Sequence, residues 1–134
     1  DSGPGATNTI TGIADAFYDS IPLVVFTGQV PQDLIGNDAF QEVDLVGLAQ
    51  PISKWSYQIR HAEDIAWAVS RAFYIARSGR PGPVVLDFPK NAQTERVEFK
   101  TQKVDFVRSY VAYPPLDHKA VRQAAALIDQ AKKP

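Results

Sequence analysis

The sequence lacks several residue types that common kinds of chemistry require. It contains no cysteine, which excludes disulfides, thiolate metal sites and cysteine nucleophiles. Its two histidines, His61 and His118, lie far apart in the sequence, which argues against a metal site formed by this chain alone. Methionine is also absent, so we expect a processed or partial chain.

Charge and hydropathy argue against two classes of partner. The 14 basic and 15 acidic residues give a net charge of −1, which provides no basic surface for nucleic acid or an anionic membrane. No apolar run approaches the roughly 18 to 20 residues that a membrane-spanning helix needs. Ser-His-Asp order, a paired-histidine motif and a Walker loop are missing too. We therefore expect a cytoplasmic protein, or an organellar one in a eukaryote, that binds neither nucleic acid nor membrane.

Helical and strand patterns alternate along the chain, which predicts an α/β fold with a parallel, helix-flanked sheet. The Gly-Pro-Gly turn within residues 2–8 leads into a helix that we expect Asn8 to cap and that reaches about Ser20. No strand precedes this turn, so we expect the chain to begin inside a strand-turn-helix unit. Residues 23–27 are typical of a strand buried on both faces. Further elements are expected at residues 44–50 (helix), 55–60 (strand), 62–78 (helix), 84–87 (buried strand) and 117–133 (helix).

Apolar residues at helical spacing predict the buried faces of the two clearest helices. The first stripe consists of Ile65, Val69, Ala72, Phe73 and Ala76. The second consists of Val121, Ala124, Ala125, Ile128 and Ala131, in a helix that Asp117 caps and Pro134 ends. Residues 91–116 have no sustained period, which favours a linker between domains.

Residues next to strand and helix ends are candidates for chemistry, because open α/β sheets place ligands at the carboxyl ends of their strands. Gln41 either faces a cofactor or is a solvated loop residue. Arg80 either holds a phosphate or nucleotide, or bonds the carbonyl groups that end the preceding helix. Lys90 either lines an active-site entrance or is simply exposed. The Gly-Pro-Gly turn either offers its N–H groups to a ligand or is only loop geometry.

Five motifs occur in a characteristic order, at residues 2–8, 22–31, 38–42, 78–84 and 87–90. Together they resemble the large, catalytic subunit of the acetolactate synthase (acetohydroxyacid synthase) family, thiamine-diphosphate enzymes of branched-chain amino-acid synthesis. The Asp-Ala-Phe-Gln-Glu motif at residues 38–42 separates this family from most of its relatives. The resemblance is dense up to Lys90 and weaker afterwards.

The resemblance implies a division of the chain and a set of site residues. Residues 1–90 would be the latter part of a pyrimidine-binding domain, 91–116 a linker, and 117–134 the start of a middle, FAD-binding type α/β domain. By motif, Pro4 and Asn8 correspond to positions near the pyrimidine ring, Gln41 to the catalytic glutamine that faces the reacting centre, and Arg80 to an arginine that contacts FAD. The positions implied to line the substrate channel, where the family's herbicides bind, are Pro31, Ala39, Phe40 and Lys90. Gln32 and Asp33 stand where many members carry basic residues.

The implied reaction decarboxylates pyruvate and transfers its two-carbon unit to a second 2-oxo acid, giving acetolactate or acetohydroxybutyrate. The implied cofactors are thiamine diphosphate, magnesium and FAD, and the implied assembly is a homodimer or homotetramer with a small regulatory subunit. The glutamate that activates the pyrimidine ring precedes the Gly-Pro-Gly motif in this family, and neither Glu42 nor Glu63 stands in its motif. The metal-binding Gly-Asp-Gly type of motif is missing as well. We therefore expect no metal ligand in this chain and no activity from the isolated chain.

Two alternatives remain open. One is another member of the superfamily, such as a pyruvate oxidase or a glyoxylate carboligase, which the residue at the upstream glutamate position would distinguish. The other is a non-catalytic interaction module whose open sheet edge and unpaired helices bind another polypeptide.

Overall fold

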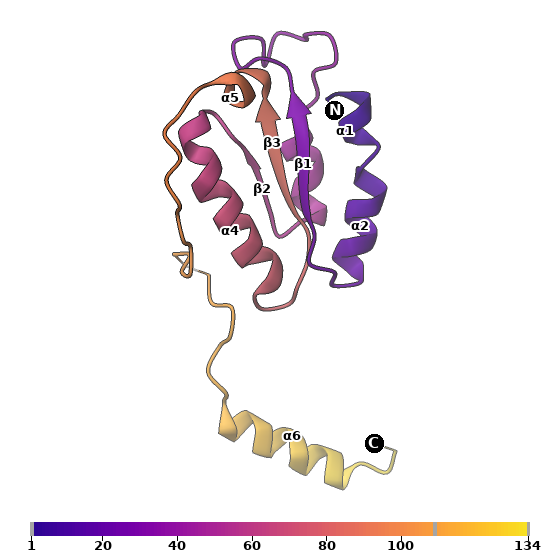
Figure 1. Cartoon of the computed structure of the whole chain (residues 1–134). Helices are drawn as coiled ribbons and strands as arrows, with labels where there is room; N and C mark the ends of the chain where they lie inside the picture. Colours follow the sequence, from indigo (N-terminus) through magenta and orange to yellow (C-terminus); the bar gives the residue numbers. More distant parts are fainter. Residues whose placement is uncertain (1, 109, 134) are drawn as a thin grey trace.

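The computed structural model describes residues 2–108 and 110–133 (Figure 1). Its centre is a three-stranded parallel sheet in the order β1 (Val24–Gln29), β3 (Val84–Pro89) and β2 (Trp55–Gln58). The predicted α/β class with a parallel, helix-flanked sheet is thereby confirmed. The helical elements are α1 (Pro4–Thr7), α2 (Ile10–Tyr18), α3 (Leu45–Ala49), α4 (Ile65–Arg77), α5 (Lys90–Thr94), α6 (His118–Gln130) and the 3-10 turns η1 (Gln50–Ile52) and η2 (Ala62–Asp64).

The central strand β3 joins the two layers of helices. Its residues Val84, Val85 and Leu86 are completely buried. Val84 and Leu86 pack in the cluster that includes α4, whereas Val85 packs with residues of α2 and α3 on the opposite face (Figure 1). Because successive strand residues point to opposite faces, a strand covered on both sides requires an unbroken apolar run. Residues 84–86 meet this requirement, and the prediction of a buried strand at residues 84–87 is confirmed.

The opening helix begins earlier than predicted. Pro4 starts α1, since its fixed φ suits the first helical turn and its missing N–H leaves no donor unpaired there. Asn8 follows α1 at its C-terminal end, with its backbone N–H bonded to the Pro4 carbonyl at 3.2 Å. Thr9 then precedes α2, and its Oγ1 donates to the Ala6 carbonyl at 2.6 Å. The prediction that Asn8 caps a single continuous helix was therefore wrong.

Two predicted burial patterns were also wrong. Within the described residues β1 is an edge strand, and Phe26 on it is 52% exposed, so β1 is not buried on both faces. Phe26 instead packs edge-on against Phe88 of β3, with ring centroids 5.6 Å apart. On α4, Phe73 is 48% exposed, although its apolar character placed it in the predicted stripe. The buried face of α4 is formed mainly by alanines, which allow the helix to approach the sheet closely.

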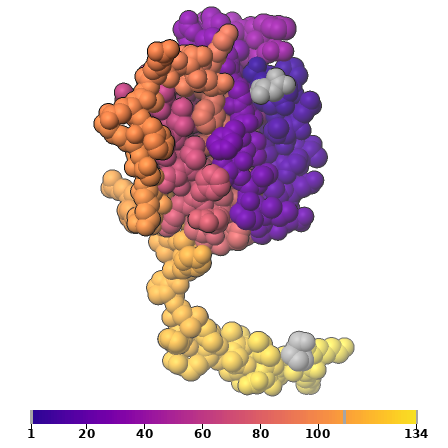
Figure 2. Space-filling view, viewed as in Figure 1, coloured from indigo at the N-terminus to yellow at the C-terminus, as the bar shows by residue number. Residues whose placement is uncertain are grey.

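The segment predicted as a linker, residues 91–116, packs against α4 and the residue that follows it. It begins with α5, a short helix that the sequence pattern did not indicate, and continues along the surface beside α4, where it is orange in Figure 2. Val107 is 7% exposed, and the Val104 N–H donates to Ser70 Oγ at 2.9 Å. The Tyr110 hydroxyl donates to the Ser78 carbonyl, also at 2.9 Å. The domain boundaries proposed from the sequence stay a prediction.

The helix α6 lies apart from the sheet (Figure 1). Asp117 caps it as predicted, because its Oδ1 accepts from two N–H groups of the first turn, those of Lys119 at 2.9 Å and Ala120 at 3.0 Å. No residue within α6 is buried, so the prediction of an inward apolar stripe was wrong for this structure. The helix ends at Gln130, and Pro134 lies outside the described residues.

None of the helices in the described part of the chain combines the length and apolar character that crossing a bilayer requires.

Candidate functional site

Most of the candidate residues lie at one end of the sheet. The loop of residues 30–44 follows β1, and α5 begins with Lys90 directly after β3, so both leave the carboxyl ends of neighbouring parallel strands. The opening turn and α1 lie at the same end (Figure 1). A hydrogen bond joins this loop to α5: the Gln32 N–H donates to Asn91 Oδ1 at 3.0 Å. The ligand-binding edge expected for an α/β sheet therefore carries three of the predicted motifs.

The opening turn meets the loop through a backbone contact between Gly3 and Gln41. A Cβ atom on Gly3 would lie 2.6 Å from the Gln41 carbonyl oxygen and 2.8 Å from its Cα. Gly3 also has a φ of 51°, in the region that glycine favours. Only glycine allows the two segments to approach this closely. The contact brings the neighbouring candidates Pro4 and Gln41 into one site, although they are far apart in the sequence.

Glu42 organises the tip of the loop. Its carboxylate accepts from the Gly36 N–H at 2.5 Å and from the Ala39 N–H at 2.9 Å. These bonds lower the pKa of Glu42 below its ordinary value, since they favour the charged form. Next to Glu42, Phe40 is 89% exposed and Gln41 is also exposed. The loop thus exposes the aromatic ring of Phe40 and the amide of Gln41 at the carboxyl edge of the sheet.

A buried carboxylate lies beneath this loop. Asp87 of β3 is completely buried and accepts from Thr27 Oγ1 at 3.0 Å, Gln29 Nε2 at 3.1 Å and Gln58 Nε2 at 3.1 Å. Burial raises the pKa of Asp87, and the three hydrogen bonds partly oppose that effect. Sequence reasoning missed this group. The signal was an aspartate that continues an otherwise apolar buried strand, where a charge requires partners.

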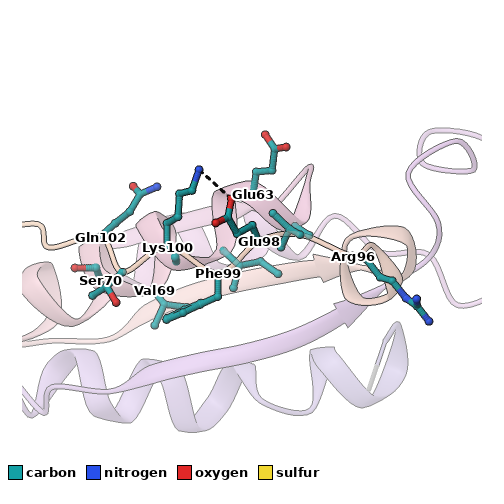
Figure 3. Close-up of a pocket in the computed structure, with 13 residues that line it drawn as sticks. Glu63, Val69, Ser70, Arg96, Glu98, Phe99, Lys100 and Gln102 are labelled. Atoms are coloured by element: carbon teal, nitrogen blue, oxygen red, sulfur yellow. Dashed lines mark ion pairs between the residues drawn. The ribbon is translucent and has the colours of Figure 1, made fainter.

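Two cavities differ in their relation to the candidate residues. A cavity of about 340 Å³ lies under the loop and is lined by Gln29, Ile35, Gly36, Glu42, Val43, Asp44, Val46 and Gln58. A larger one, about 890 Å³, lies between α4 and residues 96–102 (Figure 3). An ion pair at its rim joins Lys100 and Glu98 at 3.3 Å. None of the predicted site residues lines either cavity, but the smaller one is lined by Glu42, the neighbour of Gln41 in the loop. We place the candidate site at the loop, because polar groups converge there at the strand ends.

Arg80 lies away from the candidate site. It precedes β3 by four residues and therefore lies at the amino end of the sheet, opposite Gln41. Its Nε donates to Ser20 Oγ at 2.8 Å and its Nη2 to the Tyr18 carbonyl at 3.0 Å. Arg80 therefore caps the end of α2, and not the end of the preceding helix α4 as the simpler interpretation held. Its predicted contact with FAD stays a prediction.

The donor groups present fit some of the implied cofactors better than others. The amides of Asn8 and Gln41 are exposed and supply both donors and acceptors, as recognition of an aminopyrimidine ring requires. For a flavin, Arg80 has already engaged Nε and Nη2. For magnesium, the side chains of residues 2–108 and 110–133 include no group of three or more histidines and carboxylates placed to bind a metal. The exposed amides of the described residues therefore suit the ring of thiamine diphosphate.

Comparison with known proteins relates the chain to thiamine-diphosphate enzymes. Residues 1–48 match the family described as "Thiamine pyrophosphate enzyme, N-terminal TPP binding domain" (thiamine pyrophosphate is thiamine diphosphate). The chain is 52% identical over 99% of its length to the acetolactate synthase isozyme 1 large subunit of Escherichia coli strain K12, of which it covers 23%. It is 60% identical over 72% of its length to the acetolactate synthase large subunit of Lactococcus lactis, covering 17% of it. With the Haemophilus influenzae large subunit the identity is 44% over 99% of the chain and 24% of the relative.

These matches confirm the resemblance that the five motifs indicated. They also show that the chain spans about a quarter, or less, of the length of these relatives.

Proposed function

We propose that the chain belongs to the acetolactate synthase large-subunit family and that it forms the pyrimidine-side part of the active site of a thiamine-diphosphate carboligase. The proposed reaction decarboxylates pyruvate and joins the two-carbon unit to a second 2-oxo acid, giving acetolactate or acetohydroxybutyrate. The observation that carries the proposal is the contact of Gly3 with the Gln41 backbone. This contact joins the opening turn and the loop at the sheet edge where α/β folds bind ligands.

Each side chain of the site has a proposed task. Bound thiamine diphosphate supplies the electron sink for decarboxylation. Gln41 is the proposed catalytic residue, because its exposed amide donates to or accepts from polar atoms at the reacting centre without changing its own charge. Pro4 begins α1 and Asn8 follows its last residue, and both would contact the pyrimidine ring. Ala39 and Phe40 supply the apolar wall that excludes water, with Pro31 and Lys90 at the substrate entrance.

The remaining cofactors and partners belong to the proposal as well. Arg80 would contact FAD, and residues outside this chain would hold magnesium and make most of the FAD contacts. The full-length subunit would assemble as a homodimer or homotetramer, with a small regulatory subunit as a further partner. We expect the isolated chain to be inactive, because Glu42, the acidic residue beside Gln41, already uses both carboxylate oxygens for loop N–H groups.

The test supplies the full-length protein with pyruvate, thiamine diphosphate and magnesium and measures acetolactate. We expect Gln41→Ala to lower kcat by about 100-fold, the usual effect of removing one well-placed polar group. Gln50→Ala is the matched control, since Gln50 is an exposed glutamine in η1, away from the loop, and its loss should leave kcat unchanged. Absence of acetolactate with the unaltered protein would reject the proposed function. Equal kcat values for the two variants would reject the role of Gln41.

A further inference from the structure

Gln29, the last residue of β1, binds both ends of the loop that carries the candidate residues. Its Nε2 donates to the Val43 carbonyl at 2.7 Å, at the end of the loop. Its Oε1 accepts from the Val30 N–H at 3.0 Å, at the start of the loop. The side chain is only 5% exposed. A single buried amide therefore closes the base of the segment that includes Phe40 and Gln41.

The sheet fixes the orientation of this amide. Gln29 Nε2 also donates to Asp87 Oδ2 at 3.1 Å, and Asp87 is held in turn by Thr27 of β1 and Gln58 of β2. An amide nitrogen only donates and an amide oxygen only accepts. With Nε2 committed to Asp87 and the Val43 carbonyl, Oε1 is directed to the Val30 N–H. The buried carboxylate thereby gives the Gln29 amide one orientation.

We infer that Gln29 is a positioning residue: by closing the loop at residues 30 and 43, it determines where Gln41 and Phe40 lie relative to the opening turn. Glu42 orders only the tip of the same loop, through Gly36 and Ala39. The tip cannot hold its place over Gly3 unless the base of the loop is also held. The inference about loop geometry follows from the contacts of Gln29, whereas its catalytic consequence rests on the proposed function.

The chain offers a matched control in Gln58. This residue is also a glutamine, and its Nε2 donates to the same Asp87 oxygen at the same distance, 3.1 Å. Gln58 belongs to β2, and no hydrogen bond joins its side chain to the loop backbone among the described residues. Gln29→Met and Gln58→Met therefore each remove one hydrogen bond to Asp87 Oδ2, while only Gln29→Met also removes the hydrogen bonds to the loop backbone.

The experiment compares both variants with the unaltered full-length protein by hydrogen exchange and mass spectrometry. We expect the peptide covering residues 31–42 to exchange about tenfold faster in Gln29→Met, because two hydrogen bonds to the loop backbone are lost. In Gln58→Met the same peptide should exchange at nearly the wild-type rate. We expect kcat/KM for pyruvate to fall about tenfold in Gln29→Met.

Equal exchange of this peptide in the two variants would overturn the inference, since the effect would then come from Asp87 alone. Faster exchange with unchanged kcat/KM would overturn the positioning role. If the unaltered protein makes no acetolactate, the proposed function fails, and the exchange comparison still decides whether Gln29 holds the loop. If Gln29→Met does not fold, Gln29→Asn replaces it. That variant keeps an amide that is one methylene too short to reach both loop ends, and the same outcomes apply.

Discussion

Replacing Gly3 with alanine should separate the opening turn from the loop that carries Gln41. The added Cβ would lie 2.6 Å from the Gln41 carbonyl oxygen, 2.8 Å from its Cα and 2.9 Å from its carbonyl carbon. All three are backbone atoms, so no side-chain rotation relieves the contact. Alanine must also adopt a φ of 51°, which L-residues disfavour and glycine tolerates. The substitution therefore combines a steric and a conformational cost.

Alanine substitutions at two other glycines distinguish the conformational cost from the steric cost. The left-handed φ costs about 1–2 kcal/mol, and forcing atoms into a filled space costs about 1–3 kcal/mol more. We expect Gly3→Ala to destabilise the fold by about 2–5 kcal/mol in total. Gly36 has a φ of 87° but nothing within 4 Å of an added Cβ, so Gly36→Ala should cost only the first amount. Gly12 lies in α2 with open space around it, so Gly12→Ala should raise the free energy of unfolding by about 0.5–1 kcal/mol.

The assay is thermal unfolding of the full-length protein and its three glycine variants, followed by acetolactate formation. The melting temperatures should decrease in the order Gly12→Ala, unaltered protein, Gly36→Ala, Gly3→Ala. Gly3→Ala should also lower kcat, because it displaces Gln41. Gly3→Ala melting at the same temperature as Gly36→Ala would refute the reasoning, since the backbone contact would then have no energetic weight.

Two other predictions concern the loop and the segment beside α4. Loop N–H groups lower the pKa of Glu42, so its stabilising contribution is complete above pH 4.5 and is lost as the pH falls through the lowered folded value. The melting temperatures of the unaltered protein and Glu42→Gln should therefore converge on acidification from about pH 7 to about pH 3, and a constant difference would contradict this account. Tyr110→Phe removes hydroxyl contacts to the Ser78 carbonyl at 2.9 Å and to Lys54 Nζ at 3.1 Å, each worth about 1 kcal/mol. Limited proteolysis should then cleave residues 100–112 faster, and an unchanged cleavage rate would show that the hydroxyl does not anchor this segment.

Several elements could be predicted because their signals are local. The apolar run at residues 84–86 indicates a strand covered on both faces, and it is the central strand. Asp44 and Asp117 precede helices, and both accept hydrogen bonds from the first turn of α3 and α6. Such signals depend on neighbours within a few residues, so they survive without knowledge of the rest of the fold.

Patterns that depend on a partner element were less informative. The apolar stripe of α6 shows which face is suited to burial, yet Val121 and Ile128 are 50% and 61% exposed. The run at residues 23–27 is equally apolar, but β1 lies at the edge of the described sheet and leaves Phe26 exposed. Hydropathy records the preference of a side chain, whereas burial also requires another element to cover it.

Periodicity and motif order along the chain were sufficient to predict the α/β class, the buried strand at residues 84–87 and the resemblance to acetolactate synthase large subunits. It also indicated that the loop after β1 holds Gln41. Three contacts became visible only in the folded chain: Gly3 lies against Gln41, Arg80 binds the end of α2, and Gln29, held by Asp87, closes the loop. Each of these contacts joins residues that are 14 to 62 positions apart along the chain. Contacts between such distant residues depend on ångström-scale placement of strands and helices, which no local pattern specifies.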